Sequence, residues 1–309
     1  MARRRRGRRE DPGPTGFLVV DKPPGWTSHD VVDAARGWLH TRRVGHMGTL
    51  DPAATGVLPL AVRGATKLIN FVRENDKTYA GAFRLGVETD TLDAEGRVLR
   101  THSGPDPDEA RIREALRSFE GEIEQVPPMF SAVKVGGVPL HKLARKGQRV
   151  EREPKCVKVQ RFEMLKYTPP LLEIEVDCSG GTYVRVLASD LGAHLGCGAH
   201  LAGLRRTRGG PFRIEQALTP EQLARDAERG EIERRILSPL AVLGLPAICL
   251  AAHEVACAER GGVVDTQGPQ VPPGTQMVAH DGDGNIVGIL ESRPGRRLKP
   301  LRILPRNNA

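Results

Sequence analysis

The chain lacks the features that mark membrane, disulfide-rich and metal-dependent proteins. No apolar run approaches the roughly 20 residues that cross a bilayer. There is no Cys-x-x-Cys pair, and the odd number and scatter of the cysteines fit reduced thiols in a cytosolic protein rather than a disulfide framework or a zinc site. The five cysteines are Cys156, Cys178, Cys197, Cys249 and Cys257. We therefore expect a cytoplasmic protein without membrane attachment or a metal.

Signatures of cofactor binding are also missing. Neither a Walker loop nor a dinucleotide fingerprint occurs in the sequence, so we expect no cofactor. Hydrophobic residues make up 39% and charged residues 27% of the chain, which is usual for a globular protein. A length of 309 residues suffices for one large domain and a smaller one.

Positive charge is concentrated at the N-terminus rather than spread along the chain. The formal charge is +8 and the sequence pI is near 9.5, which indicates an anionic partner. Six arginines between Arg3 and Arg9 leave a net charge of only +2 for the remainder. We interpret residues 1–12 as a disordered basic tail that attracts phosphates without specificity. We do not expect a secretion signal, because Glu10–Pro14 follows where an apolar segment is required.

A second basic segment lies inside the chain. It contains eight basic residues and two glutamates, a local net charge of +6. The basic residues are Lys134, Lys142, Arg145, Lys146, Arg149, Arg152, Lys155 and Lys158. Such a patch is typical of a nucleic-acid contact, although a solvated loop can carry the same charge.

The most informative stretch is Gly45–Pro52, with the sequence Gly-His-Met-Gly-Thr-Leu-Asp-Pro. Its only carboxylate, Asp51, precedes a proline, which disfavours helical geometry at Asp51. The glycines allow a tight turn or the close approach of a ligand. An isolated Asp-Pro usually marks only a turn, but a single positioned carboxylate can also act as a nucleophile or as a base.

Apolar periodicity predicts an α+β fold in which helices flank a mixed β-sheet. We expect strands at 17–20, 57–62, 77–85 and 172–178, and helices after Thr27, at 66–72, at 108–119, between Arg185 and Gly196, and after Thr219. Alternation should place Tyr79, Phe83 and Leu85 on one face of their strand. Lys22 should lie in a turn after the first strand, and His200 should be a packed histidine.

The motifs, taken in order, closely resemble those of the TruB-type pseudouridine synthases, in the stand-alone form found in bacteria. The matching segments are Gly45–Pro52 with the following 54–59, Asp21–Gly25, Lys77–Tyr79, 86–93, 127–134, Gly181–Arg185 and 196–206. The chain departs from the family pattern at Met47, where a small polar residue is usual, and at Phe130 and His141, where tyrosine is common.

The resemblance implies a catalytic site. Asp51 matches the catalytic aspartate, Tyr79 matches a tyrosine that stacks on the target base, and Arg185 matches the motif arginine. We expect Arg185 to pair with Asp51 and keep it ionised, because an opposite charge nearby favours the carboxylate form. His46 is expected to fill the space that the flipped base vacates or to contact the neighbouring nucleotide.

The resemblance also implies further substrate contacts. Leu204 corresponds to a residue whose backbone lies beside the base. Tyr183 is expected to bound the pocket or pack on Tyr79, and Arg205 and Arg206 are expected to reach phosphates. Lys22 and Lys134 complete the expected RNA-binding residues, although a turn lysine such as Lys22 is as often simply solvated.

The expected domains follow from the same comparison. After the tail, residues 13–245 should form the catalytic domain, with an RNA-gripping insertion at about 127–155. Residues 246–309 should form a small, mainly β domain that resembles the PUA-like domain of bacterial members. The implied reaction is conversion of uridine to pseudouridine at position 55 in the T stem-loop of tRNA, by base flipping. No metal, membrane or obligate protein partner is expected.

Three alternatives remain open from the sequence. The chain could be a non-catalytic protein that binds or folds tRNA through its basic patches. It could be a hydrolase built on His46 and Asp51, although no serine or cysteine nucleophile motif supports that class. Within the enzyme class, it could be a synthase that depends on a guide RNA, although the stand-alone members resemble it across nearly the whole chain.

Overall fold

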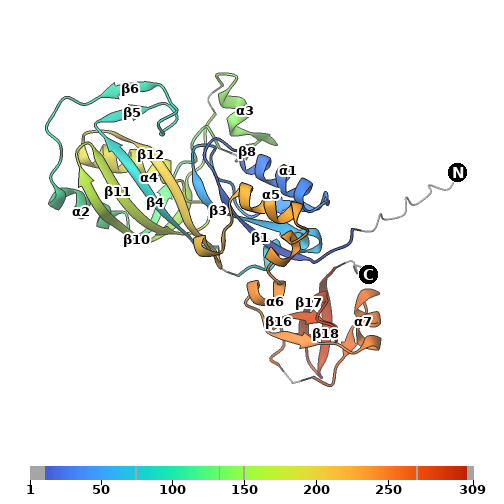
Figure 1. Cartoon of the computed structure of the whole chain (residues 1–309). Helices are drawn as coiled ribbons and strands as arrows, with labels where there is room; N and C mark the ends of the chain where they lie inside the picture. Colours follow the sequence, from blue (N-terminus) through green and yellow to red (C-terminus); the bar gives the residue numbers. More distant parts are fainter. Residues whose placement is uncertain (1–10, 74, 132, 149, 269–270, 305–309) are drawn as a thin grey trace. The chain divides into compact units, whose positions relative to one another are not determined.

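The computed structural model describes residues 11–73, 75–131, 133–148, 150–268 and 271–304, which form two compact units (Figure 1). The first unit contains the described residues of Met1–Asp51, Leu58–Glu74 and Glu215–Ala309, and the second contains Pro52–Val57 and Asn75–Ile214. Strand β3 (Thr55–Val62) begins in the second unit and ends in the first. The arginines of the N-terminal tail and Arg149 lie outside the described residues.

A mixed β-sheet forms the centre of the second unit (Figure 1). Its strands follow the order β3-β12-β4-β11-β10-β7, in which β12 is parallel to β3 and every other neighbouring pair is antiparallel. These strands are β4 (Lys77–Leu85), β7 (Gly121–Gln125), β10 (Lys155–Thr168), β11 (Leu171–Cys178) and β12 (Ala199–Gly209). The predicted α+β fold with a mixed sheet is confirmed.

Two helices cover one face of this sheet. They are α2 (Glu109–Ser118), which packs on β10, and α4 (Val184–Leu195), which packs on β12 and on α2. Edge-to-face rings join the layers: Phe83 and Phe162 lie 6.1 Å apart between centroids, and Phe119 contacts both Phe162 and His194. Helix α4 ends at Gly196 with φ of +75°, as the sequence predicts.

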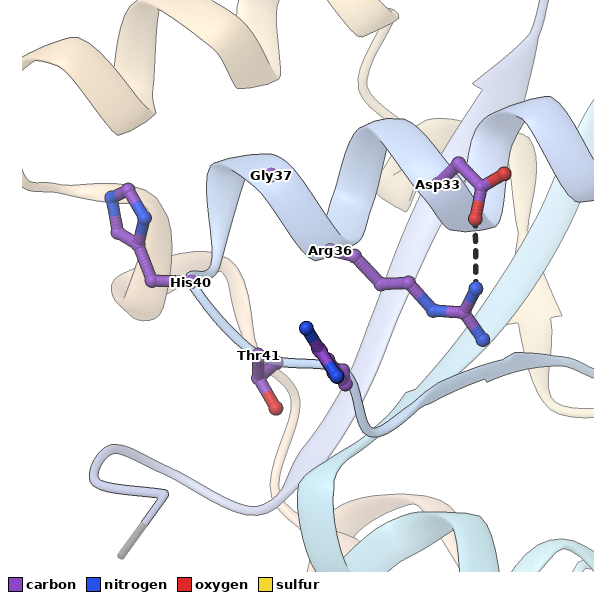
Figure 2. A pocket seen from close by; sticks show the side chains of 6 residues that line it. Asp33, Arg36, Gly37, His40 and Thr41 are labelled. Carbon is purple, nitrogen blue, oxygen red and sulfur yellow. Dashed lines mark hydrogen bonds and ion pairs between the residues drawn. The ribbon is translucent and has the colours of Figure 1, made fainter. Parts of the chain in front are cut away.

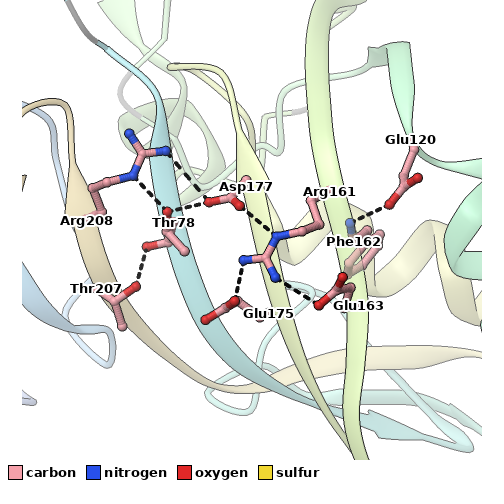
Figure 3. A network of polar contacts seen from close by, with 9 residues as sticks. All are labelled: Thr78, Glu120, Arg161, Phe162, Glu163, Glu175, Asp177, Thr207 and Arg208. Carbon is pink, nitrogen blue, oxygen red and sulfur yellow. Dashed lines mark hydrogen bonds and ion pairs between the residues drawn. The ribbon is translucent and has the colours of Figure 1, made fainter.

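The opposite face of the sheet is polar (Figure 3). Arg161 of β10 pairs with Glu163, Glu175 and Asp177, and Arg208 of β12 lies beside Asp177. The predicted alternation along 172–178 explains this separation, because Leu172, Ile174, Val176 and Cys178 are buried on the helical side.

The parallel pairing of β3 with β12 requires a glycine. Gly56 pairs with Arg206, and its φ is +100°. A Cβ atom at Gly56 would lie 2.2 Å from the carbonyl oxygen of Arg206. No L-side chain fits at that distance, so Gly56 sets how closely the two strands approach.

Shorter elements complete the second unit. They are β5 (Val87–Thr89), β6 (Val98–Thr101), β8 (Lys134–Val135), β9 (Val138–Pro139), α3 (Leu140–Ala144) and β13 (Phe212–Arg213), and η3 (Ile214–Gln216) begins at the last residue of the unit. Strands β5 and β6 form one hairpin, and β8 and β9 form another in the basic insertion.

The first unit contains the elements at both ends of the chain. Its N-terminal elements are β1 (Gly16–Lys22), α1 (Ser28–Trp38), β2 (Val44–His46), η1 (Arg63–Lys67) and η2 (Ile69–Phe71). Further elements are α5 (Pro220–Glu228), η4 (Ile232–Arg235) and α6 (Pro239–Val242). The predicted capping residues Thr27 and Thr219 begin α1 and α5, each in a reciprocal capping box.

The C-terminal part of the first unit has a five-stranded sheet of its own, with the order β14-β16-β17-β18-β15. Its elements are β14 (Ala247–Cys249), α7 (Ala252–Glu259), β15 (Val264–Asp265), β16 (Gln276–His280), β17 (Ile286–Arg293) and β18 (Arg297–Ile303). A separate core that includes Ile248, Val255 and Leu290 stabilises it. A mainly β C-terminal domain was predicted, and this sheet confirms it; the exact domain boundaries stay a prediction.

Three local predictions need correction. Lys22 was expected in a turn, but strand β1 continues through it. Both edges of β1 have partners: β3 on one side, and residues Leu218 and Leu237 on the other. The helix expected at 66–72 is instead the pair of short 3-10 helices η1 and η2. Helix α4 begins at Val184, so Arg185 lies in its first turn rather than before it.

Candidate active site

The first unit contributes the loop that carries Asp51. This loop leaves β2 after His46, which pairs with Leu60 of β3. The N–H of Met47 then donates to the carbonyl of Pro59 at 2.9 Å, and Gly48 turns the chain with φ of +105°. Asp51 is half-buried and lies in irregular backbone between the two strands, as the following proline predicts.

One side chain holds the loop at the residue before Asp51. The hydroxyl of Ser28, in the first turn of α1, donates to the carbonyl of Leu50 at 3.1 Å and accepts the N–H of Leu50 at 2.9 Å. Ser28 and Leu50 are each only 4% exposed. Both backbone groups of Leu50 are therefore fixed by a single buried atom.

Lys22 is fully buried at the end of β1. Its ammonium group donates to the carbonyls of Pro23 at 2.9 Å and Trp26 at 2.6 Å. The solvated interpretation of this lysine is therefore wrong. Lys22 instead stabilises the turn that leads into α1, because a buried ammonium needs hydrogen-bond acceptors.

In the second unit, Tyr79 and Leu204 lie on one face of neighbouring strands. Tyr79 is buried and pairs with Arg206 in register, while Leu204 pairs with Gly81. A Cβ atom at Gly81 would lie 3.4 Å from Cδ1 of Leu204 and 3.2 Å from Cδ1 of Ile174. Gly81 lies two residues after Tyr79 on β4, and its lack of a side chain leaves room for Leu204 of β12. The shared face predicted for Tyr79, Phe83 and Leu85 is confirmed, and all three side chains are buried.

The two consecutive arginines of β12 have different surroundings. Arg205 is half-buried, and its Nη1 lies 3.5 Å from Oγ1 of Thr55. Arg206 is 1% exposed, and its Nε donates to the carbonyl of Val57 at 2.7 Å. Successive side chains of a strand point to opposite faces, so the expectation that both arginines reach phosphates is wrong for Arg206. Arg206 joins β12 to β3.

Arg185 is fixed by the two loops that face the start of α4. It is 5% exposed and lies 3.6 Å from Oδ2 of Asp93. Its Nη1 donates to the carbonyl of Thr91 at 3.2 Å, and its Nη2 donates to the carbonyl of Phe130 at 2.9 Å. The guanidinium plane is therefore oriented by groups on two separate segments of the second unit.

The residue before α4 is fixed in a similar way. The side-chain amide of Gln125 accepts the N–H of Tyr183 at 2.9 Å and donates to its carbonyl at 3.3 Å. Tyr183 itself is half-buried and is the N-cap residue of α4. Gln125 thus positions the helix start that carries Arg185.

Two cations, the half-buried Lys77 and the buried Arg206, lie on the same face of the sheet as Tyr79. Lys77 begins β4, two residues before Tyr79, and lies opposite Gly209 of β12. Burial of the ammonium group lowers the pKa of Lys77, and the nearby guanidinium of Arg206 lowers it further. Deprotonation therefore becomes easier at Lys77 than at an exposed lysine.

The insertion presents its positive charge to solvent. Lys134 is exposed in β8, as are Lys142, Arg145 and Lys146 in and after α3. Arg152 is partly buried instead, and its Nη1 donates to the carbonyl of Pro127 at 2.9 Å. The insertion thus contacts Arg185 through the carbonyl of Phe130, while most of its described basic side chains remain exposed.

The packed interpretation of His200 is confirmed. Its side chain is buried, and its Nδ1 lies 2.8 Å from the carbonyl oxygen of Val87. The described residues contain no cluster of three or more His, Cys, Asp or Glu that could hold a metal. Among the same residues, no helix has the length and apolar character to cross a membrane.

A separate cavity of about 740 Å³ lies at the C-terminal end of α1 (Figure 2). Its walls are formed by Asp33, Arg36, Gly37, His40, Thr41 and Arg42. Arg36 donates to Asp33 at 2.7 Å. None of these lining residues is among the predicted site residues, so this cavity is not the candidate active site.

Comparison with solved structures defines the class of fold. The chain is similar to a protein in a complex of Cbf5, Nop10 and Gar1, with a TM-score of 0.70, 27% identity and coverage of 95% of this chain and 86% of the other. It is also similar to a chain of an H/ACA RNP bound to a substrate RNA containing 2′-deoxyuridine, with a TM-score of 0.68, 26% identity and the same coverage.

Comparison with family models is more specific. The model of the TruB family pseudouridylate synthases (N-terminal domain) matches residues 36–184, and that of the tRNA pseudouridylate synthase B C-terminal domain matches 185–243. The fold and the motifs thus define a pseudouridine synthase, an isomerase.

Curated relatives agree over most of the chain. The tRNA pseudouridine synthase B of Geobacter sulfurreducens is 42% identical, over 94% of this chain and 98% of the relative. That of Heliobacterium modesticaldum is 46% identical over 80% of each chain. The chain belongs to the TruB family of pseudouridylate synthases.

The structure brings together some of the predicted site residues. Tyr79 and Leu204 lie on one face of the adjacent strands β4 and β12 in the second unit, whereas Arg205 points to the opposite face. Asp51, His46 and Lys22 belong to the first unit and Arg185 to the second, so the pairing of Asp51 with Arg185 stays a prediction.

Three residues that hold the site residues or their neighbours were not predicted from the sequence: Ser28, Asp93 and Gln125. Asp93 is in a matched motif, but its position alone did not indicate a partner. Ser28 follows a capping residue, and Gln125 precedes the Pro-Pro pair. Neither pattern indicates the long-range contact that the residue makes.

Proposed function

We propose that this protein converts uridine to pseudouridine in tRNA, at position 55 of the T stem-loop, with Asp51 as the catalytic carboxylate. The observation that carries the proposal is 42% identity over nearly the whole chain to curated tRNA pseudouridine synthases, in a sequence whose matching motifs contain Asp51, Tyr79 and Arg185. The solved relative bound to a substrate RNA supports RNA as the substrate class.

The reaction breaks the C–N glycosidic bond, turns the freed uracil and rejoins it to the ribose through carbon. It needs neither an oxidant nor an energy source, so one positioned carboxylate suffices. Asp51 acts either as a nucleophile or as a base. Its proposed partner Arg185 keeps it ionised, because a nearby guanidinium favours the carboxylate form.

The target uridine has to leave its stack before reaction, which costs a few kcal/mol. Tyr79 stacks on the extruded base and offsets part of this cost, since such contacts contribute ~1–3 kcal/mol. Leu204 of β12 pairs with Gly81, two residues from Tyr79 on β4, and this neighbourhood supports a base-binding surface formed by the two strands. Tyr183 bounds this surface, and His46 occupies the space that the base leaves.

The remaining contacts in the proposal are made with the RNA backbone. Lys134 and the exposed lysines and arginines of the insertion attract phosphates. Arg205, whose side chain points to the opposite face of β12 from Leu204, reaches a phosphate on that side. Lys22 acts by holding the turn before α1, which fits its burial better than a direct phosphate contact.

The stand-alone mode is favoured over dependence on a guide RNA. Curated relatives named tRNA pseudouridine synthase B are 39–48% identical to this chain, whereas the solved chain from the H/ACA particle is 26% identical. A non-catalytic RNA-binding role is disfavoured because the relatives carry the name of an isomerase. The free cysteines support a reducing compartment, and we place the reaction in the cytoplasm.

Mapping of pseudouridine in an unmodified tRNA transcript after incubation with the purified protein tests the proposal. We expect one pseudouridine, at position 55, with no change in RNA mass and no strand cleavage. Release of uracil or cleavage would indicate the hydrolase, and binding without modification would indicate the non-catalytic protein. A transcript with cytidine at position 55 serves as the control and should remain unmodified.

A further inference from the structure

The hydroxyl of Ser28 makes two hydrogen bonds to a single residue 22 positions away. It donates to the carbonyl of Leu50 and accepts the N–H of Leu50. A serine hydroxyl has one O–H donor and two acceptor lone pairs, so one oxygen atom can satisfy both groups. The contact is buried, which makes its loss costly, because two backbone groups would then lack partners.

The two hydrogen bonds fix the peptide planes on both sides of Leu50. Its N–H belongs to the peptide bond with Thr49, and its carbonyl belongs to the peptide bond with Asp51. The following Pro52 restricts the backbone of Asp51 to extended conformations. Asp51 is therefore constrained from its N-terminal side by Ser28 and from its C-terminal side by Pro52, and both constraints narrow the range of directions open to its Cα–Cβ bond.

We propose that Ser28 is a positioning residue for catalysis, which aims the Asp51 carboxylate by holding the preceding peptide against the start of α1. This inference rests on the proposed function, because it assigns Ser28 a role only if Asp51 reacts. Its effect belongs in the chemical step rather than in RNA binding, since Ser28 is buried and Leu50 separates it from Asp51.

Ser28 is not needed to cap helix α1. The neighbouring Thr27 already accepts the N–H of Asp30 at 3.1 Å, and the Asp30 carboxylate accepts the N–H of Thr27 at 2.7 Å. This reciprocal box satisfies the helix start. The chain thus separates the two roles: Thr27 stabilises the helix, and Ser28 attaches the loop to it.

The test compares Ser28→Ala with Thr27→Ala in the full-length protein. Single-turnover rates of pseudouridine formation and dissociation constants for tRNA are measured for both variants and for the wild type. We expect Ser28→Ala to lower the rate ~10- to 100-fold, because a displacement near 1 Å can cost that much. The dissociation constant should change less than twofold. Thr27→Ala should lower thermal stability and keep the rate within about threefold of the wild type.

A third variant, Ser28→Cys, keeps the size of the side chain but replaces the hydroxyl with a weak donor and acceptor. It should fall between wild type and Ser28→Ala in rate, and it decides the question if Ser28→Ala does not fold. Wild-type rates in every folded Ser28 variant, or equal losses in Thr27→Ala and Ser28→Ala, would overturn the positioning role. Absence of pseudouridine with the wild type would instead contradict the proposed function.

Discussion

In the second unit, Nη1 of Arg185 lies 3.6 Å from Oδ2 of Asp93, and both side chains are largely buried. The same guanidinium donates to two carbonyls, so its plane has little freedom. A buried arginine that lost its carboxylate would keep its charge without full compensation. Asp93 therefore determines how Arg185 is presented to its proposed partner in catalysis.

Asp93→Asn should lower the single-turnover rate of pseudouridine formation ~10-fold or more, because a neutral amide orients a guanidinium less firmly than a carboxylate does. The affinity for tRNA should change little. Asp90→Asn is the matched control in the same loop, since its partner Arg97 is 89% exposed, and exposed pairs contribute little. Equal rates for Asp93→Asn and the wild type would show that Asp93 does not orient Arg185.

The polar face of the sheet predicts a dependence of stability on pH (Figure 3). Burial raises the pKa of the Asp177 carboxyl, but hydrogen bonds from Thr78 and Arg161 outweigh it, so the pKa lies below its usual 3.8. A carboxyl whose pKa is lowered by folding stabilises the protein above its unfolded pKa. This stabilisation is lost as the pH falls from about 4 through the lower, folded value.

Asp177→Asn should therefore lower the free energy of unfolding at pH 7 by about 1 to 2 kcal/mol, and the difference from the wild type should shrink below pH 4. Urea unfolding of the variant and the wild type at pH 7, 5 and 3.5 measures this difference in the free energy of unfolding. Glu163→Gln removes another carboxylate from Arg161, but Glu163 is 53% exposed, so its effect should stay within about 0.5 kcal/mol. A deficit of Asp177→Asn that persists unchanged at pH 3.5 would exclude this linkage.

The cysteines should differ in reactivity. Burial raises the pKa of the Cys178 thiol to about 11, and burial also raises the pKa of Cys197. Cys156 and Cys249 are exposed. Because the thiolate is the reactive form, iodoacetamide at pH 8 should alkylate the exposed pair in the native protein and leave Cys178 unmodified.

Peptide mass spectrometry before and after unfolding in guanidinium measures this difference. All five cysteines should react in the unfolded chain, since each is a free thiol in the structure. Native alkylation of Cys178 as fast as that of Cys249 would contradict the burial of β11.

Gly56→Ala should destabilise the protein by about 2 kcal/mol or more, because the new Cβ would meet the Arg206 carbonyl at a positive φ. Gly37→Ala is the matched control. Gly37 lies in α1 with open space around its Cα, so alanine there should stabilise the helix by about 0.5–1 kcal/mol. Thermal unfolding of both variants measures these two effects. Similar melting temperatures for Gly56→Ala and Gly37→Ala would contradict the close pairing of β3 with β12.

Local signals in the sequence predicted much of the fold. The helix caps at Thr27 and Thr219, the alternation along β11 and the glycine that ends α4 all depend on residues within a few positions of one another. Motif residues such as Asp51 and Arg185 were also identified in advance, because their segments resemble a known family.

Features that depend on pairing between distant strands could not be predicted. Arg205 and Arg206 are chemically identical in the sequence, and only the register with β4 and β3 determines that Arg206 is buried. Lys22 resembles a turn residue until the neighbours of β1 extend the strand. The contact of Ser28 with Leu50 spans 22 residues and has no periodic pattern.

The most direct test of the proposed mechanism is the variant Asp51→Asn, which removes the negative charge and keeps the size of the side chain. Tritium release from tRNA labelled at C5 of uridine, measured together with the dissociation constant for the same tRNA, separates chemistry from binding. We predict no detectable release and an affinity within a few-fold of the wild type. Full release by Asp51→Asn would contradict the assignment of Asp51 as the catalytic carboxylate.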